Sequence, residues 1–481
     1  MICVTGSETD IAELRERLSR HAEADLQEVR IDLFDGPFSS DFDLDTDPQR
    51  LLLTCRPERE GGGFTGSEHD RLELLEGLVK RLRPAWIDVE SSSPEDRRAR
   101  IIETARSSGT KVLISRHELR TGASSRALKL AAELAELGGD AIKLAVAVED
   151  AAELVALREA ARNSSLPAVV LGMGPAGLLS RALYNRFDSI FTYAAADVGR
   201  ATAPGQLSAQ TFRDWQLPLD DTTPIYVLLG GSQVMDSPGP RVYNRLFARR
   251  EIDACYLPVV TDRPDETMSL LLDLGLRGAS VTMPLKERVQ GLLHELSVEA
   301  RTSGVVNTIS LVGDGELRGD LTDGDGAVAA LEQFCQSVGG RQVVVLGTGG
   351  AAAAIARSLH IARAQVTVLG RNVERAELLA TRLAVHAGAL EDLASTPFDL
   401  LVNATPVGEG DPDASLVDDP SLLKGKVVLD VVHGERTRLL RETEAAGGQP
   451  ITGRSMWAEQ GVRQLRRWLS IDVTAVELEQ D

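Results

Sequence analysis

Residues 140–154 read DAIKLAVAVEDAAEL, and a single lysine stands in the middle of their apolar run. Branched aliphatic residues alternate with Ala141, Lys143 and Ala145, which is the period of two expected of a β-strand. One face of this predicted strand is aliphatic, and the other places Lys143 between two alanines. A lysine that reaches water at a strand end explains this pattern, and so does a lysine in a site that needs room around its amine.

The same unit, a short apolar strand followed by a loop and an amphipathic helix, repeats through the first half of the chain. The predicted strands are MICVTGS (1–7), LQEVRID (26–32), RLLLTCR (50–56), AWIDVE (85–90), KVLISRH (111–117), DAIKLAV (140–146), PAVVLGMG (167–174) and SIFTYAA (189–195). Helical patterns follow most of them, as in IAELRERLSRHAEA and DRLELLEGLVKRL. Eight such units in roughly 215 residues predict a (β/α)8 barrel.

Composition limits what the chain can be. Its 481 residues are too many for one ordinary domain, and its formal net charge of −20 argues against a general nucleic-acid binder. The four scattered cysteines have neither disulfide-framework nor zinc spacing, so no metal site is expected. The chain shows no signal-peptide pattern and no apolar run of about 18 residues, so we expect a cytoplasmic protein without a membrane segment.

Polar residues gather where a barrel carries its chemistry, at the carboxyl ends of the predicted strands. They are Glu28, Arg30, Arg56, Glu60, Asp88, Glu90, Ser115, His117 and Lys143. The seventh loop contains GMGPAG (172–177) and the eighth contains ATAPGQ (201–206). Each residue has a structural alternative, such as a salt bridge, but burying many polar groups together is costly unless they form a site.

Six motifs occur in order: EVRID (28–32), CRPEREGG (55–62), ISRHEL (114–119), DAIKLAV (140–146), GMGPAGLLSR (172–181) and APGQ (203–206). Together they resemble type I 3-dehydroquinate dehydratase over essentially the whole first half. The resemblance implies that Lys143 forms a Schiff base with the substrate ketone, that His117 is the general base and acid, and that Glu60 orients the imidazole. It also implies that Arg181 binds the substrate carboxylate. The remaining implied pocket positions are Glu28, Arg30, Arg56, Met173, Thr202 and Gln206.

The physical chemistry of the opening stretch agrees with this role. An amine inside a barrel is poorly solvated, which favours its neutral, nucleophilic form. The alanines beside Lys143 leave room for a substrate ring, and the iminium acts as an electron sink when the neighbouring carbon loses a proton. Thr202 stands where the resembled family often has serine, and it keeps the hydroxyl.

The second half begins after QLPLDDTTP (216–224), a polar segment with two prolines that we expect to be a linker over 217–223. Farther on, GGRQVVVLGTGGAAAAIARSLH (339–360) predicts a strand, a glycine turn and a helix. The turn lacks the full G-x-G-x-x-G pattern. The next strand ends at Arg371, where a ribose-binding acid would stand, and an arginine there favours the 2′-phosphate of NADP.

Further motifs in this half are VTMPLK (281–286), GVVNT (304–308), GDLTDGDG (319–326), GRNVERA (370–376), NATPVG (403–408), LDVVHGERTRLL (429–440) and GRSMWAEQG (453–461). They resemble shikimate dehydrogenase. The resemblance implies that Lys286 and Asp323 assist proton transfer to the ketone. Implied substrate positions are Ser237, Thr282, Asn307, His433 and Gln460. Implied cofactor positions are Gly347, Gly349, Gly350, Ala351, Arg371, Asn372, Arg375, Asn403, Thr405 and Met456.

Departures from that family cluster in the substrate pocket. Gly239 replaces a serine, Tyr243 a histidine, and Ser280 and Leu321 replace asparagines, while His433 stands where a tyrosine is usual. We expect the changes to weaken shikimate binding or to shift substrate preference.

The predicted fold is α/β throughout: a TIM barrel over 1–216 and a two-lobed unit over 224–481. Its substrate lobe spans 224–337 plus about 455–481, and its Rossmann-type NADP lobe spans 338–454. The resemblances imply a shikimate-pathway enzyme that is both a lyase, converting 3-dehydroquinate to 3-dehydroshikimate, and an oxidoreductase, converting 3-dehydroshikimate to shikimate. A quinate-type dehydrogenase and a non-catalytic sensor stay open for the second half, as do a monomer and a homodimer.

Overall fold

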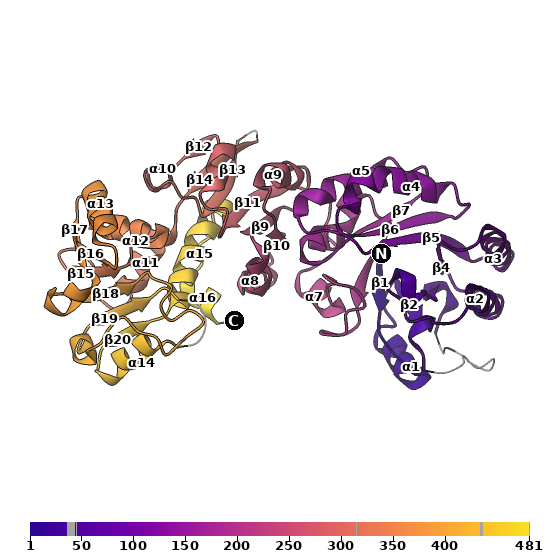
Figure 1. The fold of residues 1–481 in the computed structure, drawn as a ribbon, viewed down its shortest axis with the longest axis horizontal. Helices are drawn as coiled ribbons and strands as arrows, with labels where there is room; N and C mark the ends of the chain where they lie inside the picture. Colours follow the sequence, from indigo (N-terminus) through magenta and orange to yellow (C-terminus); the bar gives the residue numbers. More distant parts are fainter. Residues whose placement is uncertain (36–43, 45, 314, 433–435, 481) are drawn as a thin grey trace. The chain divides into compact units, whose positions relative to one another are not determined.

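The computed structural model describes residues 1–35, 44, 46–313, 315–432 and 436–480. The chain forms two compact units, residues 1–276 and 277–481, which are coloured along the chain in Figure 1. Within the described ranges no helix has the length and apolar character needed to cross a membrane. The same ranges hold no group of three or more histidine, cysteine, aspartate or glutamate side chains suited to a metal ion.

The first sheet is the predicted barrel. Its eight strands are β1 (Ile2–Thr5), β2 (Leu26–Arg30), β3 (Leu51–Thr54), β4 (Trp86–Glu90), β5 (Lys111–Glu118), β6 (Ala141–Ala147), β7 (Ala168–Met173) and β8 (Thr192–Ala195). They follow the order β7-β6-β5-β4-β3-β2-β1-β8, and neighbouring strands are parallel. A bridge between Ala168 of β7 and Ser189, just before β8, nearly closes the sheet. All eight predicted strands are confirmed.

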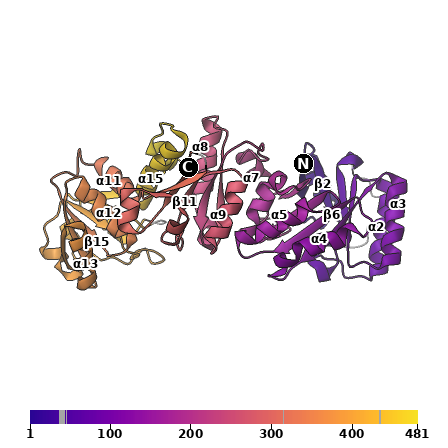
Figure 2. The same cartoon turned by 90° about the horizontal axis from the view of Figure 1, so that it is seen from above.

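Helices alternate with these strands and cover the outside of the barrel, as Figures 1 and 2 show for α2 to α5. They are α1 (Ile11–Arg20), α2 (Glu68–Leu82), α3 (Glu95–Ser108), α4 (Ala127–Ala135), α5 (Leu154–Arg162), α6 (Leu178–Ala182) and α7 (Ala209–Asp214). Local signals set their ends: the Asp10 carboxylate caps α1, the Ser67 hydroxyl caps α2, and Gly109 ends α3 with a positive φ.

Side chains from every strand fill the barrel interior, so the barrel is a packed core with a site at one end. Ala141 and Ala145 of β6 lie in this interior, with Trp86 of β4, Tyr193 of β8 and Phe191 just before β8. The alternation predicted for residues 140–154 is therefore confirmed, because the side chains of Lys143 and the two alanines lie on the same, inward face of β6.

The second sheet has six strands in the order β10-β9-β11-β13-β14-β12. They are β9 (Ile225–Gly230), β10 (Cys255–Val260), β11 (Leu276–Val281), β12 (Glu295–Leu296), β13 (Thr308–Val312) and β14 (Glu316–Asp320). Strands β9 and β10 are parallel, whereas β13 runs antiparallel to both β11 and β14. The accompanying helices are α8 (Gly239–Arg249), α9 (Pro264–Asp273) and α10 (Val298–Ser303).

The third sheet is parallel and has the order β17-β16-β15-β18-β19-β20. Its strands are β15 (Gln342–Leu346), β16 (Gln365–Gly370), β17 (His386–Ala389), β18 (Leu400–Asn403), β19 (Val427–Asp430) and β20 (Gln449–Ile451). The helices are α11 (Asp323–Glu332), α12 (Gly350–Ile361), α13 (Val373–Leu383), α14 (Arg438–Ala445), α15 (Gly453–Leu469) and α16 (Ala475–Glu479). Numbered from β15, the order is 3-2-1-4-5-6, so the predicted Rossmann-type fold is confirmed.

Candidate active sites

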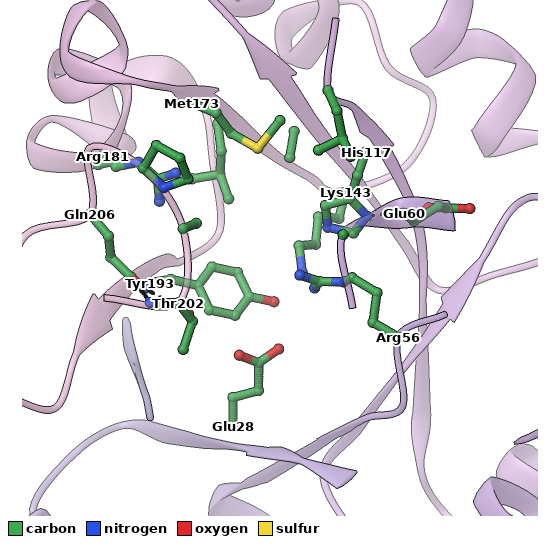
Figure 3. Close-up of a pocket in the computed structure, with 16 residues that line it drawn as sticks. Glu28, Arg56, Glu60, His117, Lys143, Met173, Arg181, Tyr193, Thr202 and Gln206 are labelled. Carbon is green, nitrogen blue, oxygen red and sulfur yellow. Dashed lines mark hydrogen bonds and ion pairs between the residues drawn. The ribbon is translucent and has the colours of Figure 1, made fainter. Parts of the chain in front are cut away.

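A cavity of about 220 Å³ opens where the barrel strands end (Figure 3). Of the predicted barrel-site residues, those that line it are Glu28, Arg56, Glu60, His117, Lys143, Met173, Arg181, Thr202 and Gln206. They come from six of the eight strand–loop units, so the barrel brings together residues that are far apart in the sequence. Arg30 is the predicted residue that does not line the cavity.

Lys143 projects from β6 and is almost completely buried. Its Nζ lies 2.8 Å from Asp88 Oδ2 on β4 and 4.4 Å from the centre of the Tyr193 ring. Arg56 Nη2 lies 3.7 Å from the same Asp88 oxygen. An amine needs a free lone pair to attack a ketone, and the Asp88 carboxylate lies close enough to accept a proton from Lys143.

Glu28 is a fixed negative charge on the cavity wall. Its carboxylate accepts hydrogen bonds from Thr5 Oγ1 at 2.6 Å and Thr54 Oγ1 at 2.7 Å. Burial by itself raises the pKa of Glu28, but nearby cations, first that of Lys143, and the Thr5 hydrogen bond outweigh burial and lower this pKa to about 2. Glu28 is therefore ionised at neutral pH.

His117 is arranged as a neutral base. Its Nδ1 lies 3.3 Å from Glu60 Oε2, and the other Glu60 oxygen accepts a hydrogen bond from Ser92 Oγ at 2.6 Å. Burial, followed by the positive charges of Arg56 and Lys143, lowers the pKa of His117 well below its ordinary value. Its Nε2 is buried and has no partner in the described part of the chain. In the tautomer whose Nδ1–H donates to Glu60, Nε2 has a free lone pair to accept a proton.

Arg181 is a buried cation that has no acidic partner among the residues the structure describes. Its Nε donates to the Gly172 carbonyl at 3.2 Å, and no carboxylate of the described residues forms an ion pair with it. Burial lowers the pKa of Arg181 to about 10, which still leaves it charged at neutral pH. Figure 3 shows Arg181 and Gln206 on the opposite side of the cavity from His117 and Glu60. An anionic substrate group would relieve this unpaired charge.

Arg30 has a structural partner that the sequence analysis did not assign. Its guanidinium makes a two-pronged ion pair with Asp32, at 3.0 Å and 2.6 Å. Asp32 Oδ2 also accepts a hydrogen bond from the Gly63 amide, which ties the loop after β3 to this pair. The Arg30–Asp32 pair therefore connects the end of β2 to the loop that carries Glu60.

Three polar residues that touch the predicted site were not assigned to it from the sequence: Asp88, Tyr193 and Ser92. In the sequence Asp88 was only one of several polar residues at strand ends. Its contact with Lys143 joins β4 to β6, which are separated by β5. Tyr193 lies on β8, and strand parity could have placed its side chain inside the barrel. Nothing in the sequence pairs Ser92 with Glu60.

In the second unit the predicted lysine–aspartate pair is formed. Lys286 Nζ lies 2.7 Å from Asp323 Oδ2, and Asn307 Nδ2 donates to Asp323 Oδ1 at 2.6 Å. Asn307 is fixed in turn, because its Oδ1 accepts from Thr308 Oγ1 and from the Thr322 amide, both at 2.9 Å. The Lys286 side chain is 28% exposed, so the pair is open to a ligand.

The remaining predicted substrate residues are distributed over both units. Thr282 follows β11 and Gln460 lies on α15, where its Cβ and backbone face Gly326 of α11. Ser237 belongs to the first unit, where its hydroxyl accepts from the Gly239 amide at 3.2 Å. His433 lies outside the described residues.

The departures in the substrate lobe are accommodated by packing and local hydrogen bonds. Tyr243 is buried and stacks on Tyr256 with ring centres 4.5 Å apart. Leu321 is buried, and the Ser280 hydroxyl donates to Gln464 Oε1 at 2.8 Å.

The glycine turn after β15 is shaped to admit a phosphate. Gly347 has a φ of +114°, and a side chain there would also meet the Ala404 carbonyl. A Cβ on Gly349 would meet nothing within 4 Å, so the space beside this turn is open. Gly350 and Ala351 begin α12, whose amide groups and dipole favour an anion at this end.

Arg371, Asn372 and Arg375 follow β16 beside this turn, because Gly370 packs against Thr348 of the turn. Arg371 and Arg375 are exposed, and the side-chain oxygen Oδ1 of Asn372 caps α13 by accepting from the Arg375 backbone amide at 2.9 Å. These residues fit the 2′-phosphate of NADP, which an acid at the strand end would repel.

The other predicted cofactor residues hold the loop after β18 and the core beside it. Asn403 is buried, and its amide donates to the Val407 carbonyl and to Asp430, while its oxygen accepts from the backbone and hydroxyl of Thr405. Met456 packs into the core of the nucleotide lobe from α15.

Models of known protein families match three separate segments of the chain. The family model described as type I 3-dehydroquinase matches residues 2–216. The shikimate dehydrogenase substrate binding domain matches 229–309, and shikimate / quinate 5-dehydrogenase matches 329–407. The bifunctional 3-dehydroquinate dehydratase/shikimate dehydrogenase of Arabidopsis thaliana is 30% identical over 467 residues, which cover 92% of this chain and 77% of that protein. The chain belongs to this bifunctional family.

Single-function relatives match the second half alone. The NADP(+) shikimate dehydrogenase of Pyrococcus abyssi is 38% identical over 250 residues, covering 51% of this chain and 92% of that protein. A crystal structure of the Listeria monocytogenes shikimate 5-dehydrogenase with shikimate and NAD is 25% identical, with a TM-score of 0.51. It covers 55% of this chain and 97% of the other.

Proposed function

We infer that the chain is a bifunctional enzyme of the shikimate pathway. Its barrel is a 3-dehydroquinate dehydratase, and its second half is an NADP-dependent shikimate dehydrogenase. The observation that carries the dehydratase is the barrel cavity, in which a buried lysine, a neutral histidine and an unpaired arginine face one space. We propose 1–216 as the dehydratase domain, 217–223 as a linker and 224–481 as the dehydrogenase. Within the dehydrogenase, the substrate lobe is 224–337 plus about 455–481, and the nucleotide lobe is 338–454.

In the proposed dehydratase reaction Arg181 binds the substrate carboxylate and so sets the orientation of the ring. Lys143 loses a proton and its nitrogen attacks the ketone carbon, and the carbonyl oxygen leaves as water, which produces a protonated imine. Asp88 lies close enough to Lys143 to accept that first proton and to face the cation afterwards.

The elimination then uses His117 twice. Its Nε2 takes a proton from the carbon next to the imine, and the electron pair of that C–H bond moves toward the cation. His117 returns the proton to the departing hydroxyl, which leaves as water. Glu60 holds the Nδ1 proton through both steps, and hydrolysis of the imine restores Lys143 and releases the ketone product.

In the proposed reductase half, Lys286 donates a proton to the ketone oxygen of 3-dehydroshikimate. Asp323 holds the Lys286 amine in place, and Asn307 fixes Asp323 through the opposite oxygen. NADPH supplies the hydride when it is bound. The glycine turn and α12 hold its pyrophosphate, and Arg371 contacts the 2′-phosphate, with Arg375 and Asn372 beside it.

Covalent trapping tests the barrel proposal. Borohydride added with 3-dehydroquinate is expected to leave the reduced substrate attached to Lys143, as read by peptide mass spectrometry. His117→Ala should still be trapped while turnover stops, because the histidine is not the nucleophile. A label on any other residue, or none, would contradict the assignment of Lys143, and loss of trapping in His117→Ala would contradict the division of roles.

Cofactor selectivity tests the nucleotide-site proposal. A charge-assisted contact from Arg371 to the 2′-phosphate is worth about 1.5–3 kcal/mol, so kcat/KM should favour NADPH over NADH by roughly tenfold or more. Arg371→Ala should erase this preference without abolishing turnover. Arg382→Ala, which removes the same charge from the exposed far end of α13, serves as the control. Equal efficiency with both cofactors in the unaltered chain would refute the role of Arg371.

A further inference from the structure

Tyr193 is the cavity residue that the reaction described above leaves unused. It lies on the inward face of β8, is 4% exposed, and lines the same cavity as Lys143 and His117. Its ring packs edge-on against Phe191, the residue just before β8, with ring centres 5.5 Å apart. The phenol is therefore held in place by the barrel core while its outer end reaches the site.

The Lys143 amine contacts the face of the Tyr193 ring as well as the Asp88 carboxylate. Nζ lies 4.4 Å above the ring centre, and the Asp88 carboxylate lies 2.8 Å from the same nitrogen. An aromatic face attracts a cation, most strongly where water is excluded. In the proposed reaction this nitrogen is positively charged both as the ammonium and as the protonated imine.

The hydroxyl of Tyr193 is buried and has no hydrogen-bond partner among the described residues. Burial first, and then the charges of Glu28 and Asp88, raise the pKa of Tyr193 well above its ordinary value, so the hydroxyl keeps its proton. In Figure 3 the hydroxyl points into the open middle of the cavity, between Glu28 and Arg56. A buried donor left unpaired is costly, and a polar group of a bound substrate would satisfy it.

We propose that Tyr193 takes part in the dehydratase reaction in two ways. Its ring stabilises the cation carried by Lys143, and its hydroxyl donates a hydrogen bond to an oxygen of the bound polyhydroxy acid. This inference rests on the proposed function, because it requires substrate in the barrel cavity and a cationic nitrogen on Lys143. Tyr193 contacts both the reacting nitrogen and the substrate, so it is a catalytic residue of the barrel.

Two substitutions separate the hydroxyl from the ring. Tyr193→Phe keeps the ring and is expected to raise the KM for 3-dehydroquinate about fivefold with kcat within about twofold, because a hydrogen bond shared by ground and transition states is lost. Tyr193→Leu should lower kcat by about a further tenfold and slow borohydride trapping at Lys143. Replacing Tyr193 with phenylalanines of increasing fluorine content weakens the ring face at nearly constant shape, and kcat should fall stepwise.

The neighbouring residue on the same strand provides a matched control. Thr192 also has a buried hydroxyl without a partner in the described part of the chain, but it lies on the opposite face of β8 and does not line the cavity. Thr192→Val should leave KM and kcat for the dehydratase unchanged. Reduction of 3-dehydroshikimate by the second half of each variant checks that the chain is intact.

Each outcome has a definite meaning. Unchanged KM and kcat in Tyr193→Phe would overturn the hydroxyl contact. Equal kcat in Tyr193→Leu and Tyr193→Phe, or a flat fluorinated series, would overturn the role of the ring. An equal rise of KM in Thr192→Val would show that the effect comes from β8 packing, which also overturns the proposal. Failure to trap any substrate on Lys143 in the unaltered chain would instead refute the proposed function itself.

Discussion

The protonation state of each charged group in the barrel cavity follows from its neighbours. Cations outweigh burial at Glu28 and keep it ionised, whereas burial and cations act together on His117 and keep it neutral. Arg181 keeps its charge but has no acidic partner in the described structure. At neutral pH the cavity therefore contains an ionised Glu28, a neutral His117 and a charged Arg181.

The pH dependence of the dehydratase tests the state of His117. Because the imidazolium form is disfavoured, the neutral base should persist as the pH falls through 6.5, the ordinary pKa of histidine. We expect kcat/KM for 3-dehydroquinate to stay flat from neutral pH to well below 6.5. A fall in kcat/KM centred at or above pH 6.5, traced to His117, would contradict the arrangement.

Single residues could be predicted when a motif and strand parity agreed, as for Lys143 between its alanines. Contacts across the barrel could not be predicted in this way, since β4 and β6 are not adjacent and no local pattern links Asp88 to Lys143. Arg30 illustrates the same limit. Its position at a strand end could be predicted from the sequence, but its ion pair with Asp32 two residues later could not.

At the scale of elements, the glycines of GDLTDGDG are needed for packing around the lysine–aspartate pair. Asp323 begins α11, and the next residue, Gly324, faces the backbone of Ala354 and the hydroxyl of Ser358 on α12 without room for a side chain. Gly326 faces α15 at Gln460 in the same way. The two close approaches fix α11, and with it the Asp323 carboxylate.

A pair of glycine substitutions tests this packing. Gly324→Ala should destabilise the dehydrogenase half by about 1–3 kcal/mol, because the new methyl group meets backbone that cannot yield easily. Gly77→Ala, on the exposed face of α2 where nothing lies within 4 Å, should stabilise the barrel by about 0.5–1 kcal/mol. Midpoints of thermal inactivation, read separately for each activity, measure both. A neutral Gly324→Ala would show that α11 has room to move.

At the scale of the whole molecule, periodicity was sufficient for the barrel, because it is built from repeated strand–helix units of ordinary length. The Rossmann-type sheet was predicted from one strand–turn–helix pattern and from the resemblance to shikimate dehydrogenase. The antiparallel strands β13 and β14 of the second sheet were not predicted, since their short, mixed sequences have no clear period. The relation between the two activities also belongs to this scale. The product of the barrel reaction is the ketone that the second half reduces. Because both sites are on one chain, they are always present in equal number.

The most direct test of the account is the oxidation of NADPH by the full chain supplied with 3-dehydroquinate alone. We predict steady consumption of NADPH by the unaltered chain and none by Lys143→Ala, which should still consume NADPH when given 3-dehydroshikimate. Lys286→Ala should accumulate 3-dehydroshikimate, and an equimolar mixture of the two variants should restore the coupled reaction. Consumption of NADPH from 3-dehydroquinate by Lys143→Ala, or none by the unaltered chain, would contradict the account.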